Sequence, residues 1–140
     1  MRRDAWRFGY TACAIDELNK AMINLQSQSV SNVASIVQAG AMPVLRGEAD
    51  DFIEEMRHEY ERRRDFGTDA IGAIPGLSVV KPDGAFYFFI DCSQVEPNSM
   101  KFCMQLLDKG LVATVPGSGF GMDGHFRISF ACSMENLKRG

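Results

Sequence analysis

The sequence predicts an α/β (α+β) fold in which a mixed sheet is covered by helices, and two observations lead to this prediction. In the first half of the chain, apolar residues recur every three to four positions, which is the spacing of one helix face. After Ile74-Pro75-Gly76 the repeat changes, and short runs rich in β-branched and aromatic residues follow, separated by turns. Helices followed by strands, with one crossover helix between them, predict a mixed α/β layer.

Two helices are expected before residue 47. Asp16 can cap the first and Ser31 the second, because a short side chain carrying oxygen accepts a hydrogen bond from a free helical amide. Pro43 should end or kink the second helix, since proline lacks an N–H and its ring crowds an earlier carbonyl. The apolar positions expected to face inward are Leu18, Met22 and Leu25 in the first helix and Val33, Val37, Ala41 and Val44 in the second.

A third helix is expected from Glu48 to Phe66. Phe52, Met56 and Tyr60 lie on one stripe of it, which would face the core. Glu59 and Arg63 are four residues apart, so an ion pair between them can stabilise the outer face.

Four strands and two more helices are expected in the second half. A helix capped by Ser99 and stopped by Gly110 separates the second strand from the third, and Ser133 opens a last helix. The predicted strands, all in one sheet, are Leu77 to Lys81, Ala85 to Cys92, Leu111 to Val115 and Phe126 to Cys132.

Composition and charge exclude several classes of protein. The 140 residues are 46% hydrophobic and 24% charged, which is typical of a globular domain with a packed core. A net charge of −3 provides no basic field for nucleic acid. The arginine run from Arg62 to Arg64 is flanked by Glu59, Glu61 and Asp65, which indicates a solvated helix face rather than a nucleic-acid site.

No segment of the sequence has the length and apolarity of a membrane-spanning helix or the core of a signal peptide, so we expect a cytoplasmic protein without a membrane partner. The cysteines form no C-x-x-C pair, and neither His58 nor His125 lies near one of them in sequence, so no metal site is expected. Reduced and mostly buried thiols are expected at Cys13, Cys92, Cys103 and Cys132.

Three features could carry chemistry, and the residues alone leave each open. The loop from Pro116 to Gly121 either cradles an anion with its amides or simply reverses the chain. Arg127 lies in the middle of a predicted strand, where it snorkels, pairs with a buried acid, or binds an anionic ligand. Arg7 either binds a ligand or stacks on its neighbour Trp6. Ser118, Asp123 and His125 are too close along one loop to indicate a catalytic triad.

Six segments, in order, resemble one known family. They are "WRFGY", "LQSQSVSN", "RRRDF", "PDGAFYFFID", "VPGSGFG" and "RISFACSMENL", and they extend from Trp6 to the end of the chain. Together they resemble the C-terminal portion of class I and II pyridoxal-phosphate-dependent aminotransferases of the aspartate aminotransferase kind. The resemblance implies the C-terminal small domain of a fold type I transferase at 48–140, preceded at 1–47 by a strand and helices of the large cofactor-binding domain.

The resemblance also implies roles for individual residues. In the family, the arginine of W-R-x-G-Y binds the cofactor phosphate, which here is Arg7, and the arginine of R-[IL]-S-[YF]-A binds the substrate α-carboxylate, which here is Arg127. A forked guanidinium suits both groups. Family segments that line the substrate side of the cleft correspond to Gly84, Phe86, Ser118 and Phe120, although these four also fit as turn and core residues.

One family residue is not found in the sequence. The Schiff-base lysine of the family stands roughly eight residues before the phosphate arginine, and that position falls upstream of Met1. We therefore expect no catalytic residue in this chain, no specific binding of pyridoxal 5'-phosphate by the chain alone, and no transamination without the missing part.

Two functions remain open at this stage. The first is the C-terminal portion of an aminotransferase that acts on an amino acid and a 2-oxo acid. The second is a noncatalytic α/β module that associates with itself through helix faces. Under either one, the apolar stripes of the first helices predict a homo-oligomer.

Overall fold

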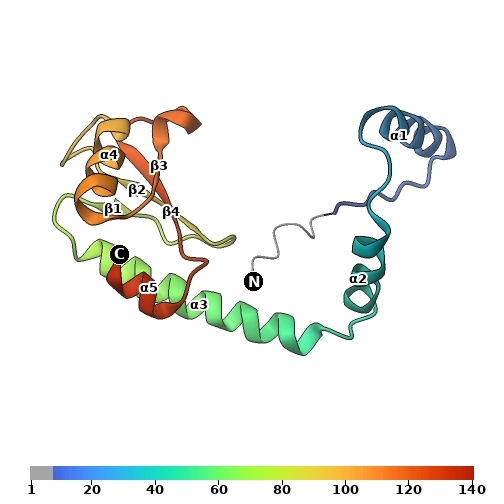
Figure 1. Ribbon diagram of the computed structural model, residues 1–140, viewed down its shortest axis with the longest axis horizontal. Coiled ribbons are helices and arrows are strands. Elements are labelled where there is room, and N and C mark those ends of the chain that lie inside the picture. Colours follow the sequence, from blue (N-terminus) through green and yellow to red (C-terminus); the bar gives the residue numbers. More distant parts are fainter. Residues whose placement is uncertain (1–7) are drawn as a thin grey trace. The chain divides into compact units, whose positions relative to one another are not determined.

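The computed structural model describes residues 8–140, which form two compact units. The first unit ends at Ile53, and the second extends from Glu54 to Gly140. Figure 1 shows the order of the elements, with helices α1 to α3 followed by a small sheet and two further helices. No helix in the described part of the chain is long and apolar enough to cross a membrane.

Helices α1 (Asp16–Ser29) and α2 (Ser35–Leu45) belong to the first unit. Neither begins with the predicted cap. Ile15 is the N-cap of α1, so Asp16 is the first helical residue, where its charge complements the positive end of the helix. Ser31 has a φ of 59° and lies outside α2, whose N-cap is Ala34. The backbone at Ser31 is left-handed and cannot lead directly into a right-handed helix.

Pro43 lies inside α2, which continues to Leu45. Of the two predicted outcomes, an end or a kink, the first is wrong, because the helix ends two residues after Pro43. The carbonyls of Met42 and Pro43 accept hydrogen bonds from the amides of Arg46 and Glu48, at 3.1 and 3.0 Å. These bonds satisfy two carbonyls at the C-terminal end of α2, so the proline is accommodated close to the end of the helix.

The first unit exposes most of the apolar residues that its helices carry. Ala41 is the one buried hydrophobic residue among the described residues of this unit. Leu18, Leu25 and Val44, which were expected to face inward, are 47%, 72% and 47% exposed. Among the described residues of the first unit, nothing covers these three side chains.

Helix α3 (Asp50–Gly72) starts two residues later and ends six residues later than the sequence predicts. The predicted ion pair forms, with Arg63 Nη2 2.9 Å from Glu59 Oε1. The helix continues past Phe66 because its last turns pack on the sheet, where Gly67 and Ile71 are buried. Gly67 permits this contact, since a Cβ at this position would lie 2.5 Å from Cε2 of Phe88.

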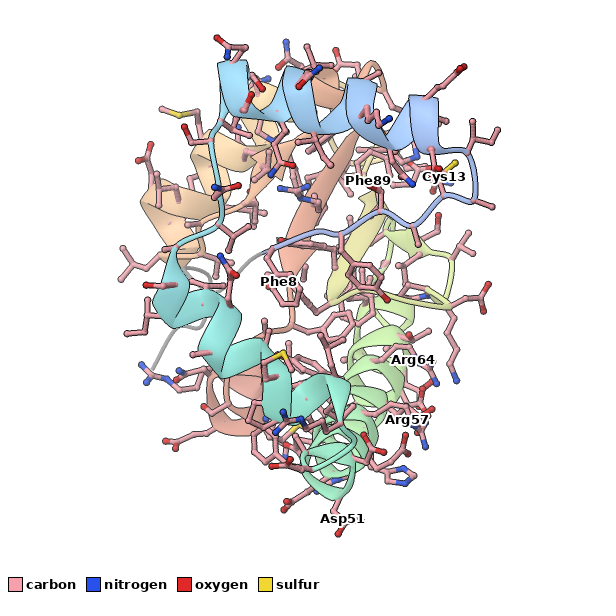
Figure 2. All side chains as sticks on the ribbon, turned by 90° about the vertical axis from the view of Figure 1, so that its right-hand side faces the viewer. Phe8, Cys13, Asp51, Arg57, Arg64 and Phe89 are labelled. Atoms are coloured by element: carbon pink, nitrogen blue, oxygen red, sulfur yellow. The ribbon has the colours of Figure 1, made fainter. Side chains whose placement is uncertain are left out.

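The arginine run of α3, predicted to form a solvated helix face, pairs with acids beside it. Arg62 is 71% exposed and bonds to Glu59, while Arg64 is only 22% exposed and bonds to Asp65. The solvated-face prediction therefore holds fully for Arg62 alone. Figure 2 shows Arg57 and Arg64, two turns apart, on one side of the helix.

The sheet has four strands in the order β1-β2-β4-β3. All three pairs are antiparallel, so the predicted mixed sheet is wrong in this respect. Although β2 and β3 run in the same direction, β4 lies between them, so the crossover produces no parallel pair. All four strands are shorter than predicted: β1 is Ser78–Val79, β2 Tyr87–Asp91, β3 Val115–Pro116 and β4 His125–Ser129. The prediction for β3 is largely wrong, since only Val115 of the expected segment Leu111 to Val115 is in the strand.

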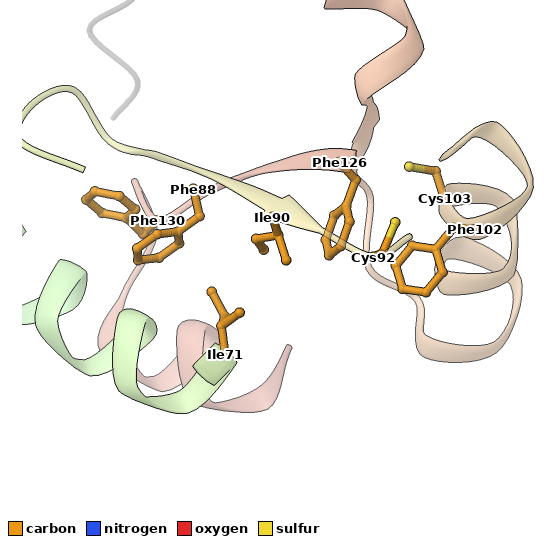
Figure 3. Packing of buried hydrophobic residues seen from close by; sticks show 8 residues of the cluster. All are labelled: Ile71, Phe88, Ile90, Cys92, Phe102, Cys103, Phe126 and Phe130. Carbon is orange, nitrogen blue, oxygen red and sulfur yellow. The ribbon is translucent and has the colours of Figure 1, made fainter. Parts of the chain in front are cut away.

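The core of the second unit lies on one face of this sheet. Phe88 and Ile90 of β2 and Phe126 of β4 meet Ile71 of α3 and Phe102 of α4, as Figure 3 shows. Phe130 completes the centre, with its ring centroid 4.6 Å from that of Phe88. The four cysteines are free, and the remaining core members are Cys92 and Cys103.

Two short helices complete this unit. Helix α4 (Ser99–Gly110) ends at the predicted glycine, but its cap is Asn98, whose side chain accepts from the amide of Lys101. Ser99 is therefore not the cap. Helix α5 (Met134–Arg139) is capped by Ser133 as predicted. It lies along α3 (Figure 1), where Lys138 Nζ is 5.7 Å from the centroid of the Phe66 ring.

We predict that Gly67→Ala lowers the free energy of unfolding by about 1–3 kcal/mol, because its methyl group overlaps the buried Phe88 ring. Gly72→Ala is the matched control on the same helix, where a Cβ meets nothing within 4 Å. Chemical denaturation should show no loss of stability for Gly72→Ala. Equal effects of the two substitutions would contradict a close contact at Gly67.

Candidate functional site

The strand alternation that builds the core also builds a second face of the sheet. Phe88 and Ile90 point to the core, so Tyr87, Phe89 and Asp91 occupy the opposite face of β2. The register of β2 with β4 sets three residues of β4 opposite them. The pairs on this face are Tyr87 with Ser129, Phe89 with Arg127, and Asp91 with His125.

Arg127 lies at the centre of this face between two aromatic rings. Its guanidinium carbon is 4.4 Å from the centroid of the Tyr87 ring and 4.6 Å from that of Phe120. The side chain is half-buried and forms no ion pair with any residue within 8–140. Of the alternatives left open by the sequence, pairing with a buried acid is therefore excluded for the described residues.

This stacking leaves the arginine suited to a carboxylate. Two rings close to a guanidinium attract its charge and restrict its rotation, and they do not use its N–H groups as hydrogen-bond donors. Those in-plane donors form the fork that binds a carboxylate through two parallel hydrogen bonds.

Two further rings, those of Phe89 and His125, lie next to the contact of Arg127 with Tyr87 and Phe120. Phe89 is paired with Arg127 across the sheet, and its ring meets that of Phe120 edge-on, with centroids 6.0 Å apart. The imidazole of His125 stacks on Phe89 at 5.3 Å. The guanidinium therefore lies in an aromatic frame formed by Tyr87, Phe89 and Phe120, and we use this name for the three residues below.

Phe120 comes from the glycine-rich loop, which forms a 3-10 turn at Gly117–Phe120. Gly117 packs so closely that a Cβ there would lie 2.2 Å from the carbonyl oxygen of Met122. The amides of Ser118, Gly121 and Met122 already donate hydrogen bonds within the protein. This favours the chain-reversing turn over an anion cradle built from backbone amides.

Asp123 and Ser99 meet beneath this turn. The Asp123 carboxylate accepts hydrogen bonds from the amides of Ser99 and Gly124, at 2.8 and 3.1 Å. The pKa of Asp123 is lowered, first by the hydrogen bond from the Ser99 side chain and then by these two amides. The carboxylate form is thus the one that the loop stabilises.

The other predicted site residues differ in their distance from Arg127. Phe86 is connected to it through Tyr87, whose ring centroid is 4.7 Å from that of Phe86. Gly84 lies apart, in the turn before β2, beside a surface pocket lined by Tyr60 and other residues. Of the predicted residues, the structure places Phe120 directly against Arg127, and Ser118 lies in the same turn as Phe120. Phe86 meets Tyr87 and Tyr60 rather than Arg127. Arg7 lies outside the described residues.

Sequence reasoning missed Tyr87, Phe89, Ser99 and Asp123 as part of this site. The period of two in the segment 85–92 was visible, and it places Tyr87 and Phe89 on one face. Which residue of β4 lies opposite them depends on the register, and no signal in the sequence gives that.

Comparison with known proteins assigns the family. The family model for aminotransferase class I and II matches residues 4–140. The chain belongs to this aminotransferase family. The probable aspartate/prephenate aminotransferase of Aquifex aeolicus is 46% identical over 139 residues, which cover 96% of this chain and 35% of that protein. The aspartate aminotransferase of Rhizobium meliloti is 42% identical over 143 residues, covering 95% and 34%.

Solved structures of aminotransferases share the fold. A tetra mutant of the Thermus thermophilus aspartate aminotransferase matches with a TM-score of 0.85 and 40% identity, covering 98% of this chain and 38% of that one. The aromatic aminotransferase of Pyrococcus horikoshii matches with a TM-score of 0.87 and 34% identity, covering 98% and 37%. The chain thus spans about a third of the length of the aminotransferases it matches.

Family membership implies pyridoxal phosphate as the cofactor of the parent enzymes. The aromatic frame around Arg127 fits a carboxylate, and it contains no lysine that could hold the cofactor covalently. Arg7, the residue expected to bind the cofactor phosphate, is not among the described residues. What the described part of this aminotransferase chain builds is a candidate substrate site.

The described part of the chain contains no candidate metal site, and the buried thiol of Cys92 is held in its protonated form. No group of three or more His, Cys, Asp or Glu side chains within residues 8–140 is placed to hold a metal ion. Burial raises the pKa of the Cys92 thiol to about 11, so it stays protonated and unreactive at neutral pH.

We predict that Asp123 makes the stability of this aminotransferase chain depend on acid. Its pKa is lowered on folding, so its contribution is fully present above the ordinary value of 3.8 and is lost as the pH falls through the folded value. Unfolding measured by denaturant between about pH 5 and pH 2 should show a shallower decline for Asp123→Asn than for the unsubstituted chain. Asp108→Asn, which removes an exposed carboxylate from α4, is the control, and identical pH profiles for all three proteins would contradict the assignment.

Proposed function

We propose that this chain supplies the substrate-carboxylate site of a pyridoxal-phosphate-dependent aminotransferase that transfers an amino group between an amino acid and a 2-oxo acid. One observation carries the proposal. Arg127 is a half-buried cation held between two rings, and it has no acidic partner within residues 8–140. An arginine placed in this way retains its charge and its in-plane donors for an anionic ligand.

Arg127 would act by orientation. Two parallel hydrogen bonds to the α-carboxylate fix the direction of the bond from that carboxylate to the α-carbon, which reduces the entropy lost on reaching a reactive geometry. Tyr87 and Phe120 keep the guanidinium plane in place and exclude water from its flat sides. In amino transfer, the cofactor supplies the electron sink. Arg127, Tyr87 and Phe120 would therefore bind and position the substrate.

The remaining predicted residues would line the substrate side. Phe86 extends the aromatic surface beyond Tyr87, while Ser118 holds the turn that carries Phe120. We infer that Gly84 shapes the turn leading into β2. Arg7 remains our assignment for the cofactor phosphate, by resemblance to the family.

We further infer the domain roles that the resemblance implies. Residues 1–47 would belong to the large cofactor-binding domain and residues 48–140 to the small domain. The reduced thiols support a cytoplasmic location.

A noncatalytic self-associating module is the second candidate, and the exposed helices of the first unit favour it. Apolar side chains of α1 and α2 such as Ile23, Leu25 and Ile36 are 64%, 72% and 67% exposed. Many exposed apolar side chains on neighbouring helices are typical of proteins that bind a partner through those helices. Self-association is compatible with both candidates, since closed homo-oligomers are common among soluble enzymes.

We predict that the purified chain sediments as a dimer or larger species at micromolar concentration. Leu25→Glu should shift it toward monomer, because a charge on α1 opposes burial of that face. Val80→Glu is the control, since Val80 is 87% exposed but belongs to the second unit. A monomer at high concentration, or equal effects of the two substitutions, would count against association through these helices.

The aminotransferase proposal is tested in a chimera. The part of the Aquifex aeolicus relative that precedes its match to this chain is joined to the chain, and amino transfer from aspartate to a 2-oxo acid is measured. We expect turnover, and we expect Arg127→Lys to raise KM by roughly 10-fold or more, because a point charge cannot reproduce the forked contact. Arg62→Lys, on the exposed face of α3, should leave KM unchanged.

Two results would contradict this proposal. An inactive chimera that still folds and binds the cofactor would favour the noncatalytic module. An active chimera with the same KM before and after Arg127→Lys would remove Arg127 from the substrate site.

A further inference from the structure

The turn that carries Phe120 is fastened to the start of α4 by a buried serine. Ser99 is fully buried, and its hydroxyl oxygen accepts a hydrogen bond from the amide of Ser118 at 3.2 Å. The amide of Ser99 donates to the Asp123 carboxylate at 2.8 Å. We call these two hydrogen bonds the Ser99 tether.

The tether closes the loop at both of its ends. Ser118 lies two residues before Phe120 and Asp123 three residues after it, so the segment between them is held on both sides by one residue of α4. The side chain of Phe120 is itself 51% exposed, and its described contacts are the rings and cation of the site. Its position therefore depends on the backbone of the loop rather than on a surrounding core.

We propose that Ser99 and Asp123 are positioning residues that hold Phe120 against Arg127 and thereby tune the affinity of the site for a carboxylate. The proposal rests on the proposed function, because it concerns the same arginine. Neither residue touches Arg127, so both act through Phe120.

The buried hydroxyl of Ser99 explains why the tether would affect Phe120. Without the Ser99 hydroxyl, the Ser118 amide loses its acceptor, and because Ser118 lies at the surface, this amide can turn toward water instead. Such a movement carries Phe120 away from the guanidinium and opens one flat side of Arg127 to solvent. The arginine then samples more orientations, and a carboxylate must immobilise it on binding.

The proposal is tested on the 140-residue chain by two measurements. The first is the NMR resonance of the Arg127 Nε–H proton, which the Tyr87 and Phe120 rings shift upfield. The second is the Kd for maleate, used as the carboxylate probe. Phe120→Leu gives the reference for an arginine that has lost one of its two rings.

Ser99→Ala and Asp123→Ala should both move the Arg127 resonance toward its position in Phe120→Leu. They should weaken maleate binding by roughly 3- to 10-fold, the range expected when about one hydrogen bond is lost. Asp123→Asn retains an oxygen that can accept from the Ser99 amide, so it should preserve most of the resonance shift.

Asn98→Ala is the matched control, because it removes the α4 cap next to Ser99 without touching the loop. It should lower the melting temperature but leave both the Arg127 resonance and the Kd unchanged. If Ser99→Ala is unfolded, Asp123→Ala, whose side chain lies at the exposed end of the tether, decides the test.

The outcomes separate this proposal from the proposed function. If the tether variants leave the Arg127 resonance unchanged, or if Asn98→Ala shifts it equally, the positioning role is overturned. If the resonance shifts as expected but the unsubstituted chain does not bind maleate, the carboxylate site fails while the link from Ser99 to Arg127 stands.

Discussion

The antiparallel pairing of β2 with β4 determines both faces of the sheet through one register. With Phe89 opposite Arg127, the alternation sends Phe88 and Phe126 into the core and leaves the guanidinium on the open face. A slip of one residue in either strand would turn that strand's core side chains toward water. A slip in β4 would also place the charge of Arg127 among the phenylalanines, without a partner. The register of β2 with β4 therefore fixes both the packing of the core and the orientation of the candidate site.

On the open face, the guanidinium of Arg127 remains available to an anionic ligand because its neighbours are aromatic rather than acidic. A carboxylate beside Arg127 would form an ion pair and compete with any anionic ligand, whereas Tyr87 and Phe120 attract the cation without occupying its N–H groups. On the core face, Gly67 lets α3 approach Phe88 closely enough to support β2 from beneath. Helix packing on one side thus fixes the strand that presents Tyr87 on the other.

Periodicity predicted the type and order of the five α-helices and four strands in the described part of the chain, because apolar residues recur at different spacings in helices and in strands. Sequence reasoning was wrong about helix caps where two neighbouring side chains could each take the position. Ser99 has the side chain of a helix cap, but its hydroxyl bonds to the loop amide of Ser118, and Asn98 takes the cap instead. Motif resemblance predicted Arg127 and Phe120 as site residues, whereas the position of Tyr87 beside Arg127 depends on a register set by residues about 40 positions away. The prediction of a mixed sheet was wrong for a related reason: the order of the strands depends on residues far apart in the sequence.

The candidate site is supported entirely by the second unit. Helices as short as α1 and α2, of 14 and 11 residues, are marginal in water unless an apolar face is packed. Within the described part of their unit, Ala41 alone among the hydrophobic residues is buried, so their stability must come from surfaces beyond it. By contrast, Arg127, the aromatic frame and the Ser99 tether all lie between Glu54 and Gly140, in the unit that contains its own core. The geometry around Arg127 therefore follows from the packing of this unit, whatever surface covers α1 and α2.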